Sequence, residues 1–253
     1  MSDMRTAKEN GLINRVSSYS SVSNYMRSEK PTSVLQYLIS LSAMSLKSVE
    51  TKFAIDSTGF RTTKFNDYCR EKHKTAQYHN WVKAHICTGV KTNIVTGVEV
   101  LEGHSADNLQ FIILAEKTRV AGFKIKEMSA DKAYSGRKNL AYIDSAGGVP
   151  FIPFKNNTTG HLRGEGGHIW RKMYNFFTFR REEFLQHYHL RSNIESTNNM
   201  IKAKFTYLVR SKDKTAQINE VLLKVLCHNL VVLIQETQEL GIEPNFFTTP
   251  SSS

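Results

Sequence analysis

The chain is poor in cysteine, proline and tryptophan, and it has less acidic than basic charge. Its 253 residues include 3 Cys, and Cys69, Cys87 and Cys227 form no CxxC pair. An odd number of widely spaced thiols argues against a disulfide framework and against a four-thiolate zinc site. We therefore expect a reducing compartment, the cytoplasm, for this protein.

Long hydrophobic runs are also lacking. The first ten residues, MSDMRTAKEN, do not contain the apolar core of a signal peptide. The most apolar stretch, residues 221–235, includes Lys224, His228 and Asn229. It is shorter than the about 20 apolar residues that a bilayer requires. The sequence therefore predicts no membrane-spanning helix.

Basic residues are abundant. Lys and Arg number 34 against 23 Asp and Glu, which gives a formal net charge of +11. The excess is concentrated in residues 160–214, with 11 Lys and Arg against 5 Asp and Glu, and in residues 60–83, with 6 against 2. At 40% hydrophobic residues the chain can bury a sizeable core, so global disorder is excluded. The charge predicts an anionic partner, either nucleic acid or an acidic membrane surface.

The hydrophobic pattern predicts an α/β fold. Strands are expected at residues 51–56, 81–89, 93–103, 124–130 and 149–155. Helices are expected at residues 31–46, 107–122, 135–148, 185–208 and 216–240. The second and third strands form a hairpin, and βαβ units follow, so we predict a mixed five-stranded sheet with helices on both faces.

Three segments are predicted from this pattern. Residues 1–50 form a Ser-rich arm and a helix that is entered through Pro31. Residues 51–240 form the main α/β domain, with a less regular insertion at 156–184 before the next helix. Residues 241–253 are expected to be a flexible tail.

Three acidic residues lie where they can share a site. Asp56 ends the first predicted strand, Asp131 follows the fourth, and Glu195 lies in the predicted helix 185–208. Strand ends are where α/β folds place reacting groups. Three carboxylates form the oxygen-rich set that Mg²⁺ prefers, and two such ions can serve an in-line phosphoryl displacement. Taken singly, the three residues equally fit an Asx-turn, an N-cap and a solvated helix position.

The predicted helix 185–208 has two distinct stripes. A polar stripe has the spacing 0, 3, 7, 10 and 14 and consists of Tyr188, Arg191, Glu195, Asn198 and Lys202. An apolar stripe beside it consists of Leu190, Ile194, Ile201, Phe205 and Leu208. We expect the helix to bury the apolar stripe and to hold the polar one over a pocket. The alternative is a surface ladder of ion pairs, worth only tenths of a kcal/mol per pair.

The polar stripe carries a family resemblance. Tyr188-x2-Arg191-x3-Glu195-x6-Lys202 resembles the Y-x2-R-x3-E-x6-K signature of insertion-sequence DDE transposases. The segments FAIDSTGF, around Asp56, and SADKAYSG are similar to the first and second acidic motifs of that group. The resemblance extends over about residues 35–230. It implies a ribonuclease-H-like fold with a variable insertion before the Glu-bearing helix, which agrees with the predicted order of elements.

The resemblance also implies a function and its residues. The catalytic residues, which would bind two Mg²⁺ or Mn²⁺ ions, are Asp56, Asp131 and Glu195. The residues that would hold the DNA strand near the cleaved phosphate are Tyr188, Arg191 and Lys202. The implied activity is cleavage and strand transfer at the ends of an insertion sequence. Its partners would be double-stranded DNA and a second copy of the chain, in a homodimer associated with the nucleoid of a prokaryotic cytoplasm.

Several alternatives remain open at this point. The region before Asp56 is shorter than is usual in such transposases, which indicates a compact or truncated form. A non-catalytic DNA-binding derivative and a nuclease that cleaves without joining would carry much of the same pattern. A serine hydrolase or serine recombinase is a poor fit, because no His–acid pair is positioned beside Ser57.

Overall fold

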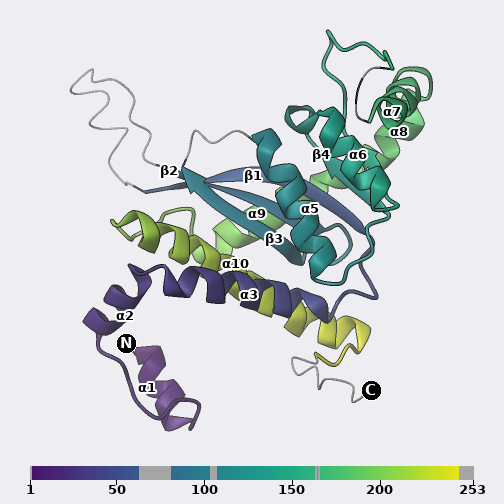
Figure 1. Ribbon diagram of the computed structural model, residues 1–253. Helices are drawn as coiled ribbons and strands as arrows, with labels where there is room; N and C mark the ends of the chain where they lie inside the picture. Colours follow the sequence, from purple (N-terminus) through teal and green to yellow (C-terminus); the bar gives the residue numbers. More distant parts are fainter. Residues whose placement is uncertain (1, 63–80, 103–106, 163, 165, 245–253) are drawn as a thin grey trace, which may run out of the picture.

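A mixed five-stranded sheet forms the centre of the computed structural model, which describes residues 2–62, 81–102, 107–162, 164 and 166–244. The strands are β1 (Lys52–Arg61), β2 (Trp81–Gly89), β3 (Val95–Glu102), β4 (Glu127–Ala130) and β5 (Val149–Phe151). Their order is β3-β2-β1-β4-β5 (Figure 1). The β1–β2 and β2–β3 pairs are antiparallel, and the β1–β4 and β4–β5 pairs are parallel. The predicted α/β fold with its mixed sheet is therefore confirmed.

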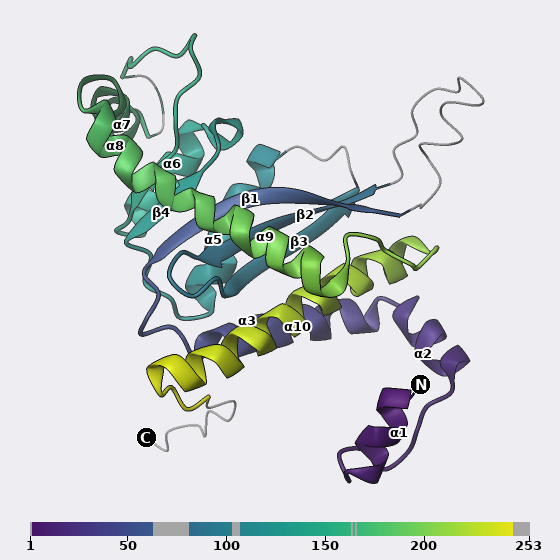
Figure 2. The ribbon, with the colours of Figure 1, turned by 180° about the vertical axis from the view of Figure 1, so that it is seen from behind.

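Helices cover both faces of this sheet. The α-helices are α1 (Ser2–Glu9), α2 (Tyr19–Met26), α3 (Lys30–Met44), α5 (Gln110–Val120), α6 (Arg137–Ser145), α7 (Gly167–Phe179), α8 (Arg181–Tyr188), α9 (Ser192–Phe205) and α10 (Lys214–Leu240). Short 3₁₀ helices are η1 (Asp107–Leu109), η2 (Lys132–Tyr134) and η3 (His189–Arg191). In Figure 1 α5 lies in front of the sheet, whereas Figure 2 shows α9 crossing the opposite face. Helices α3 and α10 pack side by side and both contact β3.

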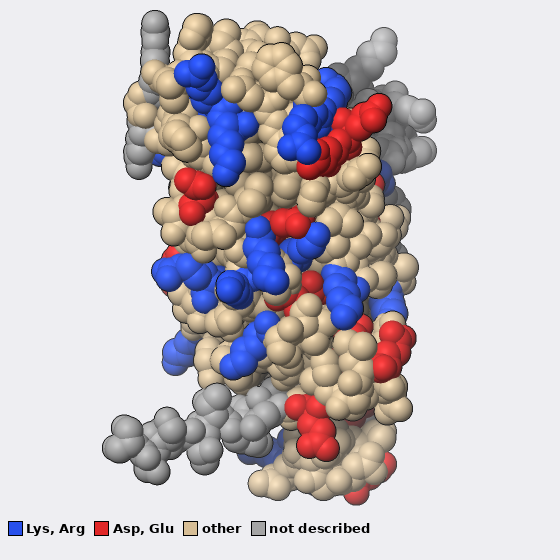
Figure 3. Space-filling model, turned by 90° about the vertical axis from the view of Figure 1, so that its right-hand side faces the viewer, with Lys and Arg blue, Asp and Glu red and all other residues tan. Residues whose placement is uncertain are grey.

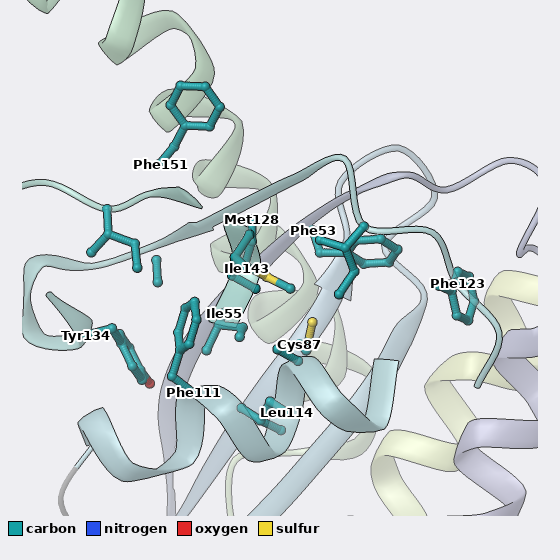
Figure 4. Packing of buried hydrophobic residues seen from close by; sticks show 14 of the residues in the cluster. Phe53, Ile55, Cys87, Phe111, Leu114, Phe123, Met128, Tyr134, Ile143 and Phe151 are labelled. Carbon is teal, nitrogen blue, oxygen red and sulfur yellow. The ribbon is translucent and has the colours of Figure 1, made fainter. Parts of the chain in front are cut away.

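The main core lies between the sheet and α5. Phe53 and Ile55 of β1 contact the α5 layer, where Phe111 and Leu114 are fully buried (Figure 4). Successive side chains of a strand point to opposite faces, so Ala54 packs on the other face, against α9. The same alternation directs the next even-numbered residue, Asp56, toward α9. Strand register thus decides on which face this acid lies.

Helix α10 is tied to the rest of the core by buried polar side chains. Asn229 is fully buried, and its Nδ2 donates to the carbonyl oxygens of Ile39 and Val95 at 3.2 and 2.8 Å. Its Oδ1 accepts the N–H of Val95 at 2.9 Å. By length and composition alone α10 is apolar enough to cross a membrane, in contrast to the prediction from residues 221–235. Half of its most apolar stretch is nevertheless buried, and these bonds join it to α3 and β3.

Two predicted elements are wrong in detail, and a third segment contains helices that the sequence does not predict. Strand β1 continues to Arg61, so Asp56 lies inside the strand and does not end it. The reason is β2, because the whole of β2 pairs with residues Phe53 to Arg61 of β1. The predicted irregular insertion 156–184 contains α7 and the start of α8. The expected Ser-rich arm contains α1 and α2.

The predicted helix 185–208 is interrupted. It consists of the end of α8, the 3₁₀ segment η3 and α9, which ends at Phe205. The α7–α8 pair is held to the sheet by aromatic contacts, because Phe151 of β5 packs edge-on against Phe176 and Phe184. These contacts fix the direction of α8, and the chain continues through η3 into α9 with helical backbone angles (Figure 2). The tail after residue 244 lies outside the described residues.

Candidate active site

Strands β1 and β4 place two carboxylates side by side. The parallel ladder ends with the pair Ile55 and Ala130. Asp56 follows the first of these residues and Asp131 follows the second. Because neighbouring strands lie about 4.8 Å apart, the two acids leave the ladder as close neighbours. Asp131 also caps η2, where its Oδ1 accepts the backbone N–H of Lys132.

The third acid comes from α9, which crosses β1. Ile194 is fully buried against Ala54, and this contact fixes the first turn of α9 over the strand. Glu195 follows Ile194 and its side chain is 59% exposed. The Arg191 guanidinium joins the two elements: Nη1 lies 3.1 Å from Glu195 Oε1, and Nη2 lies 3.4 Å from Asp56 Oδ2. Two of the predicted acids, Asp56 and Glu195, therefore contact the same basic residue of the predicted DNA-binding set.

The three acids share one electrostatic environment. Burial raises the pKa of Asp56 above its ordinary value, and the negative charges of Asp131 and Glu195 raise it further. The Arg191 charge and the backbone N–H of Ser57 act in the opposite direction. A carboxyl group is sensitive to a neighbour's charge only at short range or in a poorly screened setting. These influences on Asp56 support a single site.

The oxygen ligands of Asp56, Asp131 and Glu195 are of the chemical type that a hard divalent cation prefers. All three residues supply carboxylate oxygens, and the carboxylate of Asp56 is largely buried. In the described part of the chain, no three His, Cys, Asp or Glu side chains converge as a ready metal cage. The oxygens of Asp56 and Glu195 instead contact Arg191, and Asp131 accepts from the N–H of Lys132. The acids are thus close together but partly occupied by other partners.

The polar stripe predicted for a single helix is divided by η3. Tyr188 nevertheless stays near the acids: the Arg191 guanidinium carbon lies 6.0 Å from its ring centroid. Burial raises the pKa of Tyr188, and all three acids raise it further. Lys202 lies farther along α9, with Nζ 5.7 Å from the ring centroid of Phe60. Burial lowers the pKa of this lysine. Asn198 is buried rather than turned to an open pocket.

The apolar stripe matches its prediction in its central part. Ile194 and Ile201 are fully buried, and Leu190 packs against the small cluster that contains Ala54. Phe205 and Leu208 are only half-buried. This stripe explains why α9 keeps a fixed rotation over β1, with Glu195 beside the sheet rather than over it.

A cavity beside the acids is not predicted by the sequence. It measures about 550 Å³ and extends from Asp131 and Tyr188 toward α7 and α8. Its aromatic lining consists of Phe154, Tyr174, Phe177 and Tyr188. Its cationic lining consists of Lys132, Lys155 and Arg181. The segment HIWRKMYNFFTFRREEF carries the signal, since its aromatic residues recur at helical spacing.

A second polar cluster lies on the α5 side of the sheet. Lys83 forms an ion pair with Asp107 at the start of η1, and Asp107 Oδ1 lies 3.5 Å from His85 Nδ1. His85 is fully buried, and burial lowers its pKa. The sequence favours a capping role for Asp107, whereas His104 lies outside the described residues. This cluster is separated from Arg191 by the sheet.

Basic side chains gather on one side of the molecule. Figure 3 shows the face that forms the right-hand side of Figure 1, where α6, α7 and α8 lie. Lys and Arg side chains occupy its upper and middle parts, with fewer acidic side chains between them. This distribution agrees with the basic excess of residues 160–214. An anionic partner can approach α7 and α8, which supply part of the cavity lining, from this side.

A comparison with known families assigns the chain. The family model of the transposase DDE domain matches residues 47–230, which is most of the chain and contains all three acids. No curated protein and no solved structure matches the chain. The matched region begins just before β1 and ends within α10, so it includes the whole sheet. The fold and the matched residues agree, and the chain belongs to the transposase DDE domain family.

Proposed function

We propose that this protein catalyses metal-dependent cleavage and strand transfer at the ends of an insertion sequence. The observation that carries the proposal is that Asp56 and Asp131 follow paired residues of β1 and β4, while Arg191 joins Asp56 to Glu195 of α9. Carboxylates from three elements distant in sequence are thus brought into one region of a protein with a net charge of +11. This arrangement suits phosphoryl transfer on an anionic polymer.

The three acids are the residues that we propose to hold two Mg²⁺ or Mn²⁺ ions. Such ions, when bound, activate an attacking oxygen and stabilise the leaving oxygen of an in-line displacement. Asp56 is the candidate for contact with both ions, because it neighbours Asp131 across the β1–β4 pair and is joined to Glu195 through Arg191. Asp131 and Glu195 would each complete one site. The buried position of Asp56 also limits access of water to its carboxylate.

The neighbouring cations and rings are proposed to hold the DNA strand. Arg191 presents a planar fork that suits a phosphate, and Lys202 supplies a point charge farther along α9. Tyr188 lies between Arg191 and the cavity, where its ring can contact a sugar or a base. Lys132, Lys155 and Arg181 extend the positive charge along the cavity.

The proposed partners are double-stranded DNA and a second copy of the chain. Joining two element ends to one target needs two active sites, so we propose a homodimer on DNA. The same activity places the protein on the nucleoid in a prokaryotic cytoplasm, without a membrane partner. Light scattering of the protein mixed with end-containing DNA would measure the stoichiometry directly.

The decisive experiment uses DNA that carries the flanking terminal repeats, incubated with Mg²⁺ or with EDTA. The wild-type protein is expected to cleave and join this DNA with Mg²⁺ only. Glu195→Gln removes one ligand charge at nearly constant shape and is expected to abolish both products. Glu182→Gln, on the exposed surface of α8, is the matched control and is expected to retain them.

Other outcomes would assign a different activity. Cleavage without joined products would identify a nuclease. DNA binding without either product would identify a non-catalytic derivative. Strand cleavage that survives Glu195→Gln undiminished would exclude the proposed site.

A further inference from the structure

Arg191 bridges two of the three acids. Its two terminal nitrogens contact different elements: Nη1 meets Glu195 of α9, and Nη2 meets Asp56 of β1. The Arg191 side chain is only 16% exposed, and that of Asp56 is 18% exposed. The Arg191–Asp56 ion pair is partly buried and therefore weakly screened, whereas Glu195 is bound to the same guanidinium from the more exposed side.

The rest of the guanidinium has little freedom. Its Nε atom is buried and has no hydrogen-bond partner among the described residues. Tyr188 lies on one side, and η3 fixes the backbone at the start of α9. The guanidinium therefore occupies the space between the acids with its two outermost nitrogens committed to carboxylates. A cation that binds these same oxygens has to displace it.

A DNA phosphate would compete for the same donors. Arg binds phosphate through paired N–H groups, and carboxylates occupy two of its donor nitrogens in this structure. Because Nε is buried, a phosphate can form a bidentate contact only through Nη1 and Nη2, the same two nitrogens that contact the acids. Departure of the guanidinium from Asp56 and Glu195 would leave two negative charges without that partner, and a divalent cation would then bind more tightly.

We infer that Arg191 is a positioning residue. It holds Asp56 and Glu195 together before metal binds, and it releases both carboxylates when it binds a DNA phosphate. Metal and DNA then bind with positive coupling, so the DNA-free protein has a lower affinity for metal than the DNA-bound protein. This inference rests on the proposed function only in taking these acids as metal ligands. Because coupling is reciprocal, metal also strengthens DNA binding by the same factor.

The test measures Mn²⁺ binding by the loss of the free-ion electron paramagnetic resonance signal. Wild type, Arg191→Gln and Arg191→Lys are titrated with and without a short random-sequence DNA duplex. Without DNA, Arg191→Gln is expected to bind Mn²⁺ at least about fivefold more tightly than wild type. Arg191→Lys keeps the charge but loses the fork, so it is expected to lie between them. Arg171→Gln, an exposed loss of the same charge on α7, is the matched control and should bind like wild type.

The titrations with DNA measure the coupling between DNA binding and metal binding. DNA is expected to raise the Mn²⁺ affinity of wild type by a larger factor than that of either Arg191 variant. Asp56→Asn should remove the Mn²⁺ signal change in all backgrounds, which ties the signal to this site.

The outcomes separate the inference from the proposed function. Equal Mn²⁺ affinity in wild type and Arg191→Gln would overturn the bridge and leave the metal site standing. Wild-type affinity in Arg191→Lys, with tighter binding in Arg191→Gln, would show an effect of charge alone and would also overturn it. No Mn²⁺ binding by any protein, with or without DNA, would overturn both. Circular dichroism spectra identify any variant that fails to fold, and the remaining Arg191 variant then decides.

Discussion

Asp56→Asn is expected to stabilise the metal-free protein at neutral pH by about 1 kcal/mol. The Asp56 side chain is 18% exposed, and burial together with Asp131 and Glu195 raises its pKa. Asn has the same shape and can still accept the backbone N–H of Ser57, but it carries no charge to bury. The substitution weakens the interaction with Arg191, whose Nη2 lies 3.4 Å from Asp56 Oδ2. Strong charge-assisted bonds are shorter, so relief of burial and repulsion is expected to outweigh this weakening.

The gain should depend on pH. A raised pKa in the folded state means that folded Asp56 holds its proton more tightly than unfolded Asp56. Its contribution to stability is therefore fully present below the unfolded pKa and is lost as pH rises through the folded pKa. The advantage of Asp56→Asn is accordingly small near about pH 4 and grows toward about pH 7. Urea unfolding in EDTA at both pH values measures it, with Asp144→Asn on the exposed surface of α6 as the control.

In the presence of Mg²⁺ we expect wild type to be more stable than Asp56→Asn. Wild type is expected to gain about 1.4 kcal/mol at ten times the dissociation constant, whereas Asp56→Asn loses a ligand and gains less. The reasoning is refuted if Asp56→Asn destabilises the metal-free protein by more than about 1 kcal/mol at neutral pH. It is equally refuted if the stability difference is the same at both pH values.

Three further changes test the fold and the DNA path. Asn229→Ala leaves buried backbone groups of α3 and β3 without partners, so urea unfolding should show a decrease of about 3 kcal/mol, with exposed Asn199→Ala as the near-neutral control. Gly166→Ala should lower unfolding free energy by about 1–3 kcal/mol, because Gly166 has φ +71° and atoms of α6 fill the space that a Cβ needs. Lys202→Gln should weaken DNA binding and reduce the salt slope by about one in fluorescence anisotropy, and Lys124→Gln, at the opposite end of β4 from Asp131, should not.

Periodicity is sufficient to predict the sheet and most of its helices. Strands with alternating or β-branched residues lie near their predicted positions, since burial on one or two faces leaves a direct mark on the sequence. The end of β1 is harder to predict because an acid inside a strand looks like a strand end. Only the pairing with β2, which comes later in the chain, shows that residues beyond Asp56 remain extended. The pattern does not separate α7 from α8, because their aromatic residues pack against β5.

The spacing of the polar stripe predicts neighbouring residues, and helical rotation is one reason that they are neighbours. A continuous helix would bring Tyr188, Arg191 and Glu195 to one face by rotation of about 100° per residue. In the structure η3 is a tighter turn within a helical run that continues from α8 into α9 (Figure 2), and the packing of Ile194 on β1 sets the rotation of this run over the sheet.

The spacing of residues along the sequence does not predict which charged side chains form ion pairs with one another. The pairing of Arg191 with Asp56 spans two elements far apart in sequence, and it depends on the register of β1 and the rotation of α9. The motif along the helix therefore predicts separate roles for its charged residues, with Glu195 as a metal ligand and Arg191 as a DNA contact. The structure places them in direct contact, so the two ligands compete for one set of interactions. That competition is a tertiary property, and it makes the order of metal and DNA binding an experimental question about Arg191.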